Sequence, residues 1–201
     1  PDVPNRTLGG LVATGLSGPL WASYGQLRNH VLGATIVCGD GRALRLGGKV
    51  VKNVAGFDIL KLMVGSRGEL AVITSVTVRL FPLPVVDRLL VLEATDVSEL
   101  VSTARAVATA PIMPASIILN ATSDGGRLLV RLHGARVSVE ADQKSLEKHT
   151  GVSLEARNTP EAESLLVQER DSGINTELAV RVWALPSRIG VLLDVLKQVP
   201  G

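Results

Sequence analysis

Apolar and polar residues alternate in two separate groups of segments along this chain. The first group predicts strands, because residues such as Val76, Val78 and Leu80 are apolar at every second position. Asp58 precedes a short apolar run and suits the N-cap of a helix. In chain order we expect a strand at Val31–Cys38, a turn at Gly39–Gly41, a strand at Ala43–Leu46, a loop at Gly47–Gly56, a helix at Asp58–Val64 and a strand at Leu70–Leu80.

The second group mixes strands and helices. Its first six elements have the order β-α-β-β-α-β, which is typical of a split βαβ, ferredoxin-like sandwich. These six are expected at Arg88–Ala94, Val97–Thr109, Ser116–Asn120, Arg127–His133, Arg136–His149 and Val152–Ala156. A helix at Glu161–Arg170, a strand at Glu177–Trp183 and a helix at Ser187–Val199 follow.

Two prolines separate the groups. Pro82 and Pro84 cannot donate an amide hydrogen to a sheet, so the sheet is expected to end there. We therefore predict an α+β chain with one domain at residues 1–82 and a second at 83–201. The chain begins at Pro1 without an initiator methionine and ends just after a predicted helix, so both ends are expected to be cut.

Composition and charge exclude several classes of protein. Hydrophobic residues make up 46% of the chain, which is enough for a core, and no apolar run reaches the roughly 20 residues of a membrane span. The net charge is +2, with scattered basic residues and 2% aromatics, which argues against nucleic-acid binding. Cys38 is the single cysteine, so an internal disulfide is excluded and a small core residue is expected. The default location is the cytoplasm.

A glycine-rich segment, Asn5–Gly18, is the first candidate binding site. Glycine leaves its amide N–H unshielded, and the hydroxyl groups of Thr14 and Ser17 can reach phosphate oxygens, so this chain could lie against a phosphate or a flat ring. It matches neither the dinucleotide-binding G-x-G-x-x-G motif nor a phosphate-binding P-loop. A plain cluster of turns is an equally good interpretation of the glycines alone.

The second candidate is Gly65–Thr74, where a glycine turn leads into a strand. The open backbone of such a strand could pair with the edge of a heterocycle, as another strand would. A simple connection between a helix and a strand explains the same residues.

Together these motifs resemble the FAD-binding domain of the vanillyl-alcohol oxidase/PCMH family, and within it the FAD-binding subunits of bacterial glycolate oxidases. The diagnostic stretches are Thr7–Gly10, Ala13–Pro19 and Gly47–Asp58. The resemblance implies that residues 1–82 are the C-terminal part of a PCMH-type FAD-binding domain and that residues 83–201 are a truncated, ferredoxin-like cap domain. It covers the first 80 or so residues well and the remainder in outline.

The same resemblance implies that FAD is the cofactor. The glycine-rich segment would line the pyrophosphate and the flavin, while the turn and strand beyond residue 65 would present backbone to the adenosine side. The implied FAD-binding residues are Thr7, Leu8, Gly9, Gly10, Thr14, Gly15, Ser17, Gly18, Gly68, Val72 and Ile73. The family often has Glu where Arg67 stands, Thr at Glu69 and Gly at Ala71; an arginine there is expected to face solvent or a phosphate.

The implied function is that of a subunit which holds FAD in a glycolate oxidase complex. The complex would oxidise glycolate, a 2-hydroxy acid, to glyoxylate, with a sister catalytic flavoprotein and an iron–sulfur subunit as partners and peripheral attachment to the inner membrane through the complex. Two alternatives remain open: a fragment of a self-sufficient FAD-dependent D-lactate or 2-hydroxy-acid dehydrogenase, and a scaffold subunit without flavin.

The sequence assigns no catalytic residue and no metal site. His30, His133 and His149 are not spaced as metal ligands, and a structural or surface role is favoured for each. Arg28 and Lys52 are the candidate cations near the cofactor segments, although both fit solvated surface charges as well.

Overall fold

The computed structural model describes residues 7–48, 58–122, 124–157, 159–171 and 185–196. The chain divides into two compact units, Pro1–Leu83 and Pro84–Gly201. Most of the loop expected at Gly47–Gly56 and the whole strand expected at Glu177–Trp183 lie outside the described residues.

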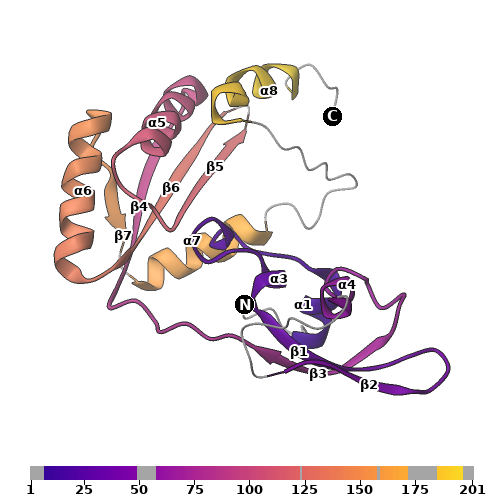
Figure 1. Cartoon of the computed structure of the whole chain (residues 1–201). Helices are drawn as coiled ribbons and strands as arrows, with labels where there is room; N and C mark the ends of the chain where they lie inside the picture. Colours follow the sequence, from indigo (N-terminus) through magenta and orange to yellow (C-terminus); the bar gives the residue numbers. More distant parts are fainter. Residues whose placement is uncertain (1–6, 49–57, 123, 158, 172–184, 197–201) are drawn as a thin grey trace. The chain divides into compact units, whose positions relative to one another are not determined.

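The first unit is built on a three-stranded antiparallel sheet in the order β2-β1-β3 (Figure 1). All three strands fall in the ranges predicted from the sequence, although β3 is shorter than expected. The elements of this unit are α1 (Leu8–Thr14), α2 (Trp21–Tyr24), α3 (Leu27–His30), β1 (Val31–Val37), β2 (Ala43–Gly47), α4 (Ile59–Met63) and β3 (Val72–Val78).

The core of this unit joins α1 and α4 to the central strand. Val12 of α1 is fully buried and packs in one cluster with Leu60 and Met63 of α4 and with the β1 residues Ala34 and Ile36. The predicted helix at Asp58–Val64 is confirmed as α4, with Asp58 at its N-cap. The Asp58 side chain makes no capping hydrogen bond, however, and instead lies 4.0 Å from the Lys61 ammonium group.

Phe81 fixes the chain where it leaves this sheet. Its ring meets the rings of Tyr24 and His30 edge-on, at centroid distances of 5.4 and 5.3 Å. The Arg79 guanidinium lies 4.7 Å from the same ring centroid, a cation–π contact. His30 also contacts the Gly25 carbonyl through Nε2 at 3.2 Å, so this histidine has the structural role that the sequence favours.

The second unit is a four-stranded antiparallel sheet in the order β5-β6-β4-β7. The connection order β-α-β-β-α-β confirms the ferredoxin-like α+β arrangement predicted from the sequence. The elements are β4 (Val86–Ala94), α5 (Val97–Thr109), β5 (Ser116–Thr122), β6 (Gly125–Gly134), α6 (Arg136–Thr150), β7 (Glu155–Arg157), α7 (Thr159–Asp171), a 3₁₀ turn (Pro186–Arg188) and α8 (Ile189–Leu196).

Helices cover both faces of this sheet. Helices α5 and α6 lie on one face (Figure 1), and α7 packs against the other. Residues at alternate positions of β4 divide between the faces. Leu90 packs with Leu100 of α5 and Leu146 of α6, whereas Leu89 and Val91 face the side that α7 covers. Alternation of side chains along the strand therefore builds two cores from one sheet.

Helix α5 coincides with its predicted range, and its start is encoded locally. The Asp96 side chain accepts a hydrogen bond from the Ser98 amide at 2.8 Å, which caps the first turn. Strand β7 is three residues long, shorter than the Val152–Ala156 prediction, since its pairing with β4 begins only at Glu155.

We expect Leu90→Ala to lower the free energy of unfolding by about 2–5 kcal/mol, because the side chain is fully buried and truncation leaves a cavity. Val137→Ala, at a position 79% exposed on α6, is the matched control and should change it by less than about 0.5 kcal/mol. Urea unfolding followed by circular dichroism measures both. Equal midpoints for the two variants would contradict the assigned core.

Candidate cofactor site

The glycine-rich segment folds as a short helix, α1, instead of the cluster of turns that its glycines suggest. Thr7 is the N-cap, and its Oγ1 accepts a hydrogen bond from the Gly10 amide at 3.0 Å. The Thr14 hydroxyl donates to the Gly10 and Leu11 carbonyl groups at 3.0 and 3.1 Å. The hydroxyl hydrogen of Thr14, predicted to reach a phosphate, is therefore engaged within the helix.

The end of α1 is joined to the second glycine motif by backbone hydrogen bonds. Gly15 takes the left-handed conformation (φ +65°) at the C-cap. The Gly65 amide then donates to the Val12 carbonyl at 3.1 Å, and the Arg67 amide donates to the Ala13 carbonyl at 2.7 Å. Amides of the Gly65–Gly68 turn thus donate hydrogen bonds to carbonyl groups at the end of α1, where a helix lacks donors of its own.

Gly15 is required at this contact for steric reasons as well. A Cβ atom there would lie 3.0 Å from Gly65 Cα, closer than side chains normally approach backbone. The two motifs predicted to contact the same cofactor are therefore in direct contact with each other, although about 50 residues separate them in the sequence.

The start of β3 lies beside the start of α1. A Cβ atom on Gly9 would stand 3.6 Å from the Ile73 carbonyl oxygen. Strand β3 is at the edge of its sheet among the described residues, so one side of its backbone is not paired with another strand there. The prediction that a ligand meets the backbone near Val72 and Ile73 concerns this edge of the sheet.

Apolar side chains on these same segments are exposed. Leu8, Leu16, Leu70 and Val72 have relative accessibilities of 48, 46, 55 and 65%. Apart from the adjoining residues of the chain, no heavy atom lies within 4 Å of the position that a Cβ would take on Gly18 or Gly68. Exposed apolar side chains and open backbone fit a large flat ligand, because its ring could cover the former and its polar edge could meet the latter.

Ser17 is half-buried, and its Oγ accepts a hydrogen bond from the Leu27 amide at 2.9 Å, so this hydroxyl orients α3. Arg28 is exposed, in the short helix α3. Asn5, Lys52 and most of the Gly47–Asp58 motif lie outside the described residues.

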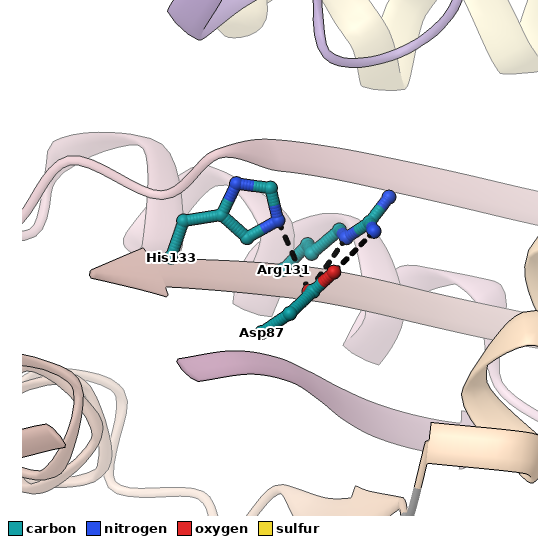
Figure 2. Close-up of polar contacts among 3 residues, drawn as sticks. All are labelled: Asp87, Arg131 and His133. Carbon is teal, nitrogen blue, oxygen red and sulfur yellow. Dashed lines mark hydrogen bonds and ion pairs between the residues drawn. The ribbon is translucent and has the colours of Figure 1, made fainter. Parts of the chain in front are cut away.

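A polar cluster that the sequence analysis did not single out lies on the second unit (Figure 2). Asp87 of β4 is directly opposite His133 of β6, whose Nε2 is 3.0 Å from Asp87 Oδ1. Arg131 meets the same carboxylate with two nitrogen atoms, and its Nε donates to Oδ1 at 2.8 Å. The sequence signal was the pair of charged or polar residues Arg131 and His133 at alternate positions of the strand predicted at Arg127–His133.

Burial and charge shift both titrating groups of the cluster. Burial lowers the pKa of His133 below its ordinary value, and the Asp87 carboxylate opposes this shift without cancelling it. Burial by itself would raise the pKa of Asp87, but the hydrogen bond and charge of Arg131, with the contribution of His133, hold it below its ordinary value. At pH 7 the cluster therefore consists of an Asp87 carboxylate paired with Arg131, beside a neutral His133. These side-chain contacts link β4 to β6.

The described residues contain no group of three or more histidine, cysteine, aspartate or glutamate side chains placed to hold a metal ion. His149 is exposed at the end of α6, and Cys38 is a half-buried free thiol beside the core of the first unit. No helix in the described part of the chain is long and apolar enough to cross a membrane.

Comparison with known proteins confirms the resemblance predicted from the motifs. The chain is 50% identical to glycolate oxidase subunit GlcE of Escherichia coli over 78 residues, which are 39% of this chain and 22% of that protein. It is 48% identical to a D-lactate dehydrogenase of Archaeoglobus fulgidus over 82 residues, 41% of this chain and 18% of the enzyme. Glycolate oxidase subunit GlcD of Bacillus subtilis is 29% identical across 84% of this chain and 40% of its own length. The chain thus spans between 18 and 40% of these relatives.

Solved structures confirm the α+β fold. Alkyldihydroxyacetonephosphate synthase matches 81% of this chain and 35% of its own with a TM-score of 0.67 and 16% identity. Glucooligosaccharide oxidase of Acremonium strictum, described with a novel flavinylation, matches 88% of this chain and 38% of its own with a TM-score of 0.55 and 16% identity. No protein-family model matches the chain.

We predict that Gly15→Ala lowers the free energy of unfolding of the first unit by about 1–2 kcal/mol. The left-handed conformation is unfavourable for alanine, and its methyl group would lie too close to Gly65. Gly18→Ala is the matched control, because open space surrounds that position. Thermal unfolding compares the two variants with the wild type. The same melting temperature for Gly15→Ala and Gly18→Ala would show that the α1–turn contact is not tight.

The stability of the second unit should fall in two steps on acidification. Because the pKa of folded His133 is lowered, the unfolded chain binds a proton first as the pH drops below about 6.5, and stability declines from there. Asp87 has a lowered folded pKa, so its contribution is present near neutrality and is lost only as the pH falls below about 4.

The variant His133→Gln should remove the first step and keep the second. The exposed His149→Gln serves as its control and should keep both steps. Urea unfolding at intervals between pH 7.5 and 3 gives the two profiles. A first step of unchanged size in His133→Gln would refute the assignment.

Proposed function

We propose that this chain is part of an FAD-dependent oxidoreductase that acts on a small 2-hydroxy acid. The main support is that two relatives, 48 and 50% identical over about 80 residues, are a D-lactate dehydrogenase and a glycolate oxidase subunit. Both names refer to 2-hydroxy acids, so the substrate class agrees even where the substrate differs. When bound, FAD would accept the two electrons that leave the hydroxy acid.

The first unit would form one wall of the FAD site. The contact between α1 and the Gly65–Gly68 turn, together with the start of β3, brings together the segments that carry the proposed FAD-binding residues. Gly18 and Gly68 would leave room for the cofactor against the backbone, because a Cβ atom at either position would meet open space. The members of this proposed set are Thr7, Leu8, Gly9, Gly10, Thr14, Gly15, Ser17, Gly18, Gly68, Val72 and Ile73.

Exposed side chains in this set would contribute apolar contacts. Leu8 and Val72 are about half to two-thirds exposed at 48 and 65%, and a planar ring that covered them would remove this apolar surface from water. The second unit, with its sheet of β4 to β7, would be the cap-like domain of the same enzyme. The catalytic residues are not assigned.

The finer proposal is a subunit of a glycolate oxidase complex. In it, this protein would hold FAD, a sister flavoprotein would oxidise glycolate to glyoxylate, and an iron–sulfur subunit would receive the electrons. The 50% identity to GlcE supports this role. Cytoplasmic location and attachment to the membrane through partner subunits belong to the same proposal.

A self-sufficient D-lactate or 2-hydroxy-acid dehydrogenase is the second candidate. It is favoured by the match to the D-lactate dehydrogenase of Archaeoglobus fulgidus, which is 48% identical over 82 residues. The two candidates differ in whether the polypeptide can turn over substrate without a partner.

The test is to produce the full-length polypeptide that carries residues 1–201 alone and to record its visible spectrum. We expect a flavin spectrum with maxima that bleach on reduction, and release of FAD on denaturation. A protein that stays colourless after incubation with excess FAD would overturn the proposal and favour a scaffold without flavin.

Assays of the same preparation with glycolate and D-lactate and a dye acceptor separate the two enzyme candidates. Bound FAD without turnover, and turnover restored by the partner subunits, is the result expected for the complex subunit. Turnover by the polypeptide alone would favour the self-sufficient dehydrogenase.

A further inference from the structure

Arg67 has a backbone conformation that residues with side chains seldom adopt. Its φ is +55°, and it is the single non-glycine residue with a positive φ in the part of the chain that the structure describes. The turn imposes this conformation, because Gly65 and Gly68 on either side also have positive φ angles (+89° and +83°) and the Arg67 amide donates to the Ala13 carbonyl.

A glycine at position 67 would meet the same geometry without strain. The arginine side chain is therefore retained at a local cost in free energy. Strained residues of this kind concentrate at functional sites, where the side chain contributes something that a strain-free residue cannot.

The Arg67 side chain is exposed, and it forms no ion pair with any carboxylate of the residues described here. It is not needed to complete the end of α1, because the Leu11, Val12 and Ala13 carbonyl groups already accept hydrogen bonds from backbone amides. Neither the packing of the turn nor a charge partner accounts for the guanidinium group.

Its location is at the cofactor site proposed above. The Arg67 amide lies 2.7 Å from the Ala13 carbonyl oxygen, immediately before Thr14 and Gly15, and Gly68 follows it with open space around its Cα. Arg67 is also the one basic residue in segments 7–18 and 65–73, which together carry all the proposed FAD-binding residues.

We propose that Arg67 binds the pyrophosphate of FAD and selects the dinucleotide over a flavin without phosphate. This inference depends on the proposed function. The pyrophosphate carries negative charge, and a guanidinium group donates several hydrogen bonds to such oxygens in a fixed fork. The cation is then supplied by a turn that the end of α1 holds in place.

The experiment measures FAD and riboflavin binding by the full-length protein, stripped of cofactor, using isothermal titration. Arg67→Asn removes the charge and tolerates a positive φ, so the backbone is kept. Arg67→Gly removes it without strain at the positive φ angle, and Arg67→Lys restores a positive charge. Glu69→Gln is the matched control, since it changes the charge of the same turn by one unit at another exposed position.

We expect Arg67→Asn and Arg67→Gly to bind FAD about ten- to a hundredfold more weakly, the effect of losing a hydrogen bond between charged groups. Arg67→Lys should recover most of the affinity, and Glu69→Gln should not weaken FAD binding. Riboflavin affinity should be the same in all variants, and the FAD affinity of the wild type should fall more steeply with salt than that of Arg67→Asn.

FAD affinity of Arg67→Asn and Arg67→Gly within twofold of the wild type would overturn the inference and leave the proposed function standing. Equal losses for FAD and riboflavin would overturn it too, because the residue would then act on the fold of the site. If the wild type takes up no FAD, the proposed function fails and the inference fails with it.

Discussion

The contact between the end of α1 and the Gly65–Gly68 turn is the constraint on which the first unit depends. Helix α1 has seven residues and two of them are glycines, so it is too short and too rich in glycine to be stable by itself. Two backbone amides of the turn donate hydrogen bonds to its last carbonyl groups, and the buried Val12 side chain adds an apolar contact. The helix therefore exists because of residues that are some 50 positions away in the sequence.

The second unit is stabilised in a different way. Its helices α5 and α6 and its strands carry their own apolar faces, and β4 divides its residues between two cores by simple alternation. Most of its elements are therefore encoded by the local order of residues, with long-range pairing deciding only the strand order. The polar cluster of Asp87, Arg131 and His133 lies at one end of a sheet face whose middle is apolar.

This contrast explains what the sequence could and could not predict. The range of α5 follows from Asp96 as a cap and from regular apolar spacing, and most strands follow from short apolar runs between turn signals. Helix α1 was missed because glycines predict turns, and the partners that override this preference are distant. Contact between the two glycine motifs was expected only through a shared cofactor, whereas the structure joins them directly by backbone hydrogen bonds. The strain at Arg67 could not be predicted at all, because it is a property of the turn's geometry.

A site built from distant segments couples ligand binding to folding. A ligand that touches α1, the turn and the start of β3 together would bind the folded unit and not the unfolded chain, so it would stabilise the unit by mass action. The glycines that give such a ligand access to backbone also raise the entropic cost of ordering these segments without it. The glycines thus both open the backbone to a ligand and lower the local stability of this unit. The hydrogen bonds between the turn and α1 keep the site formed before a ligand binds.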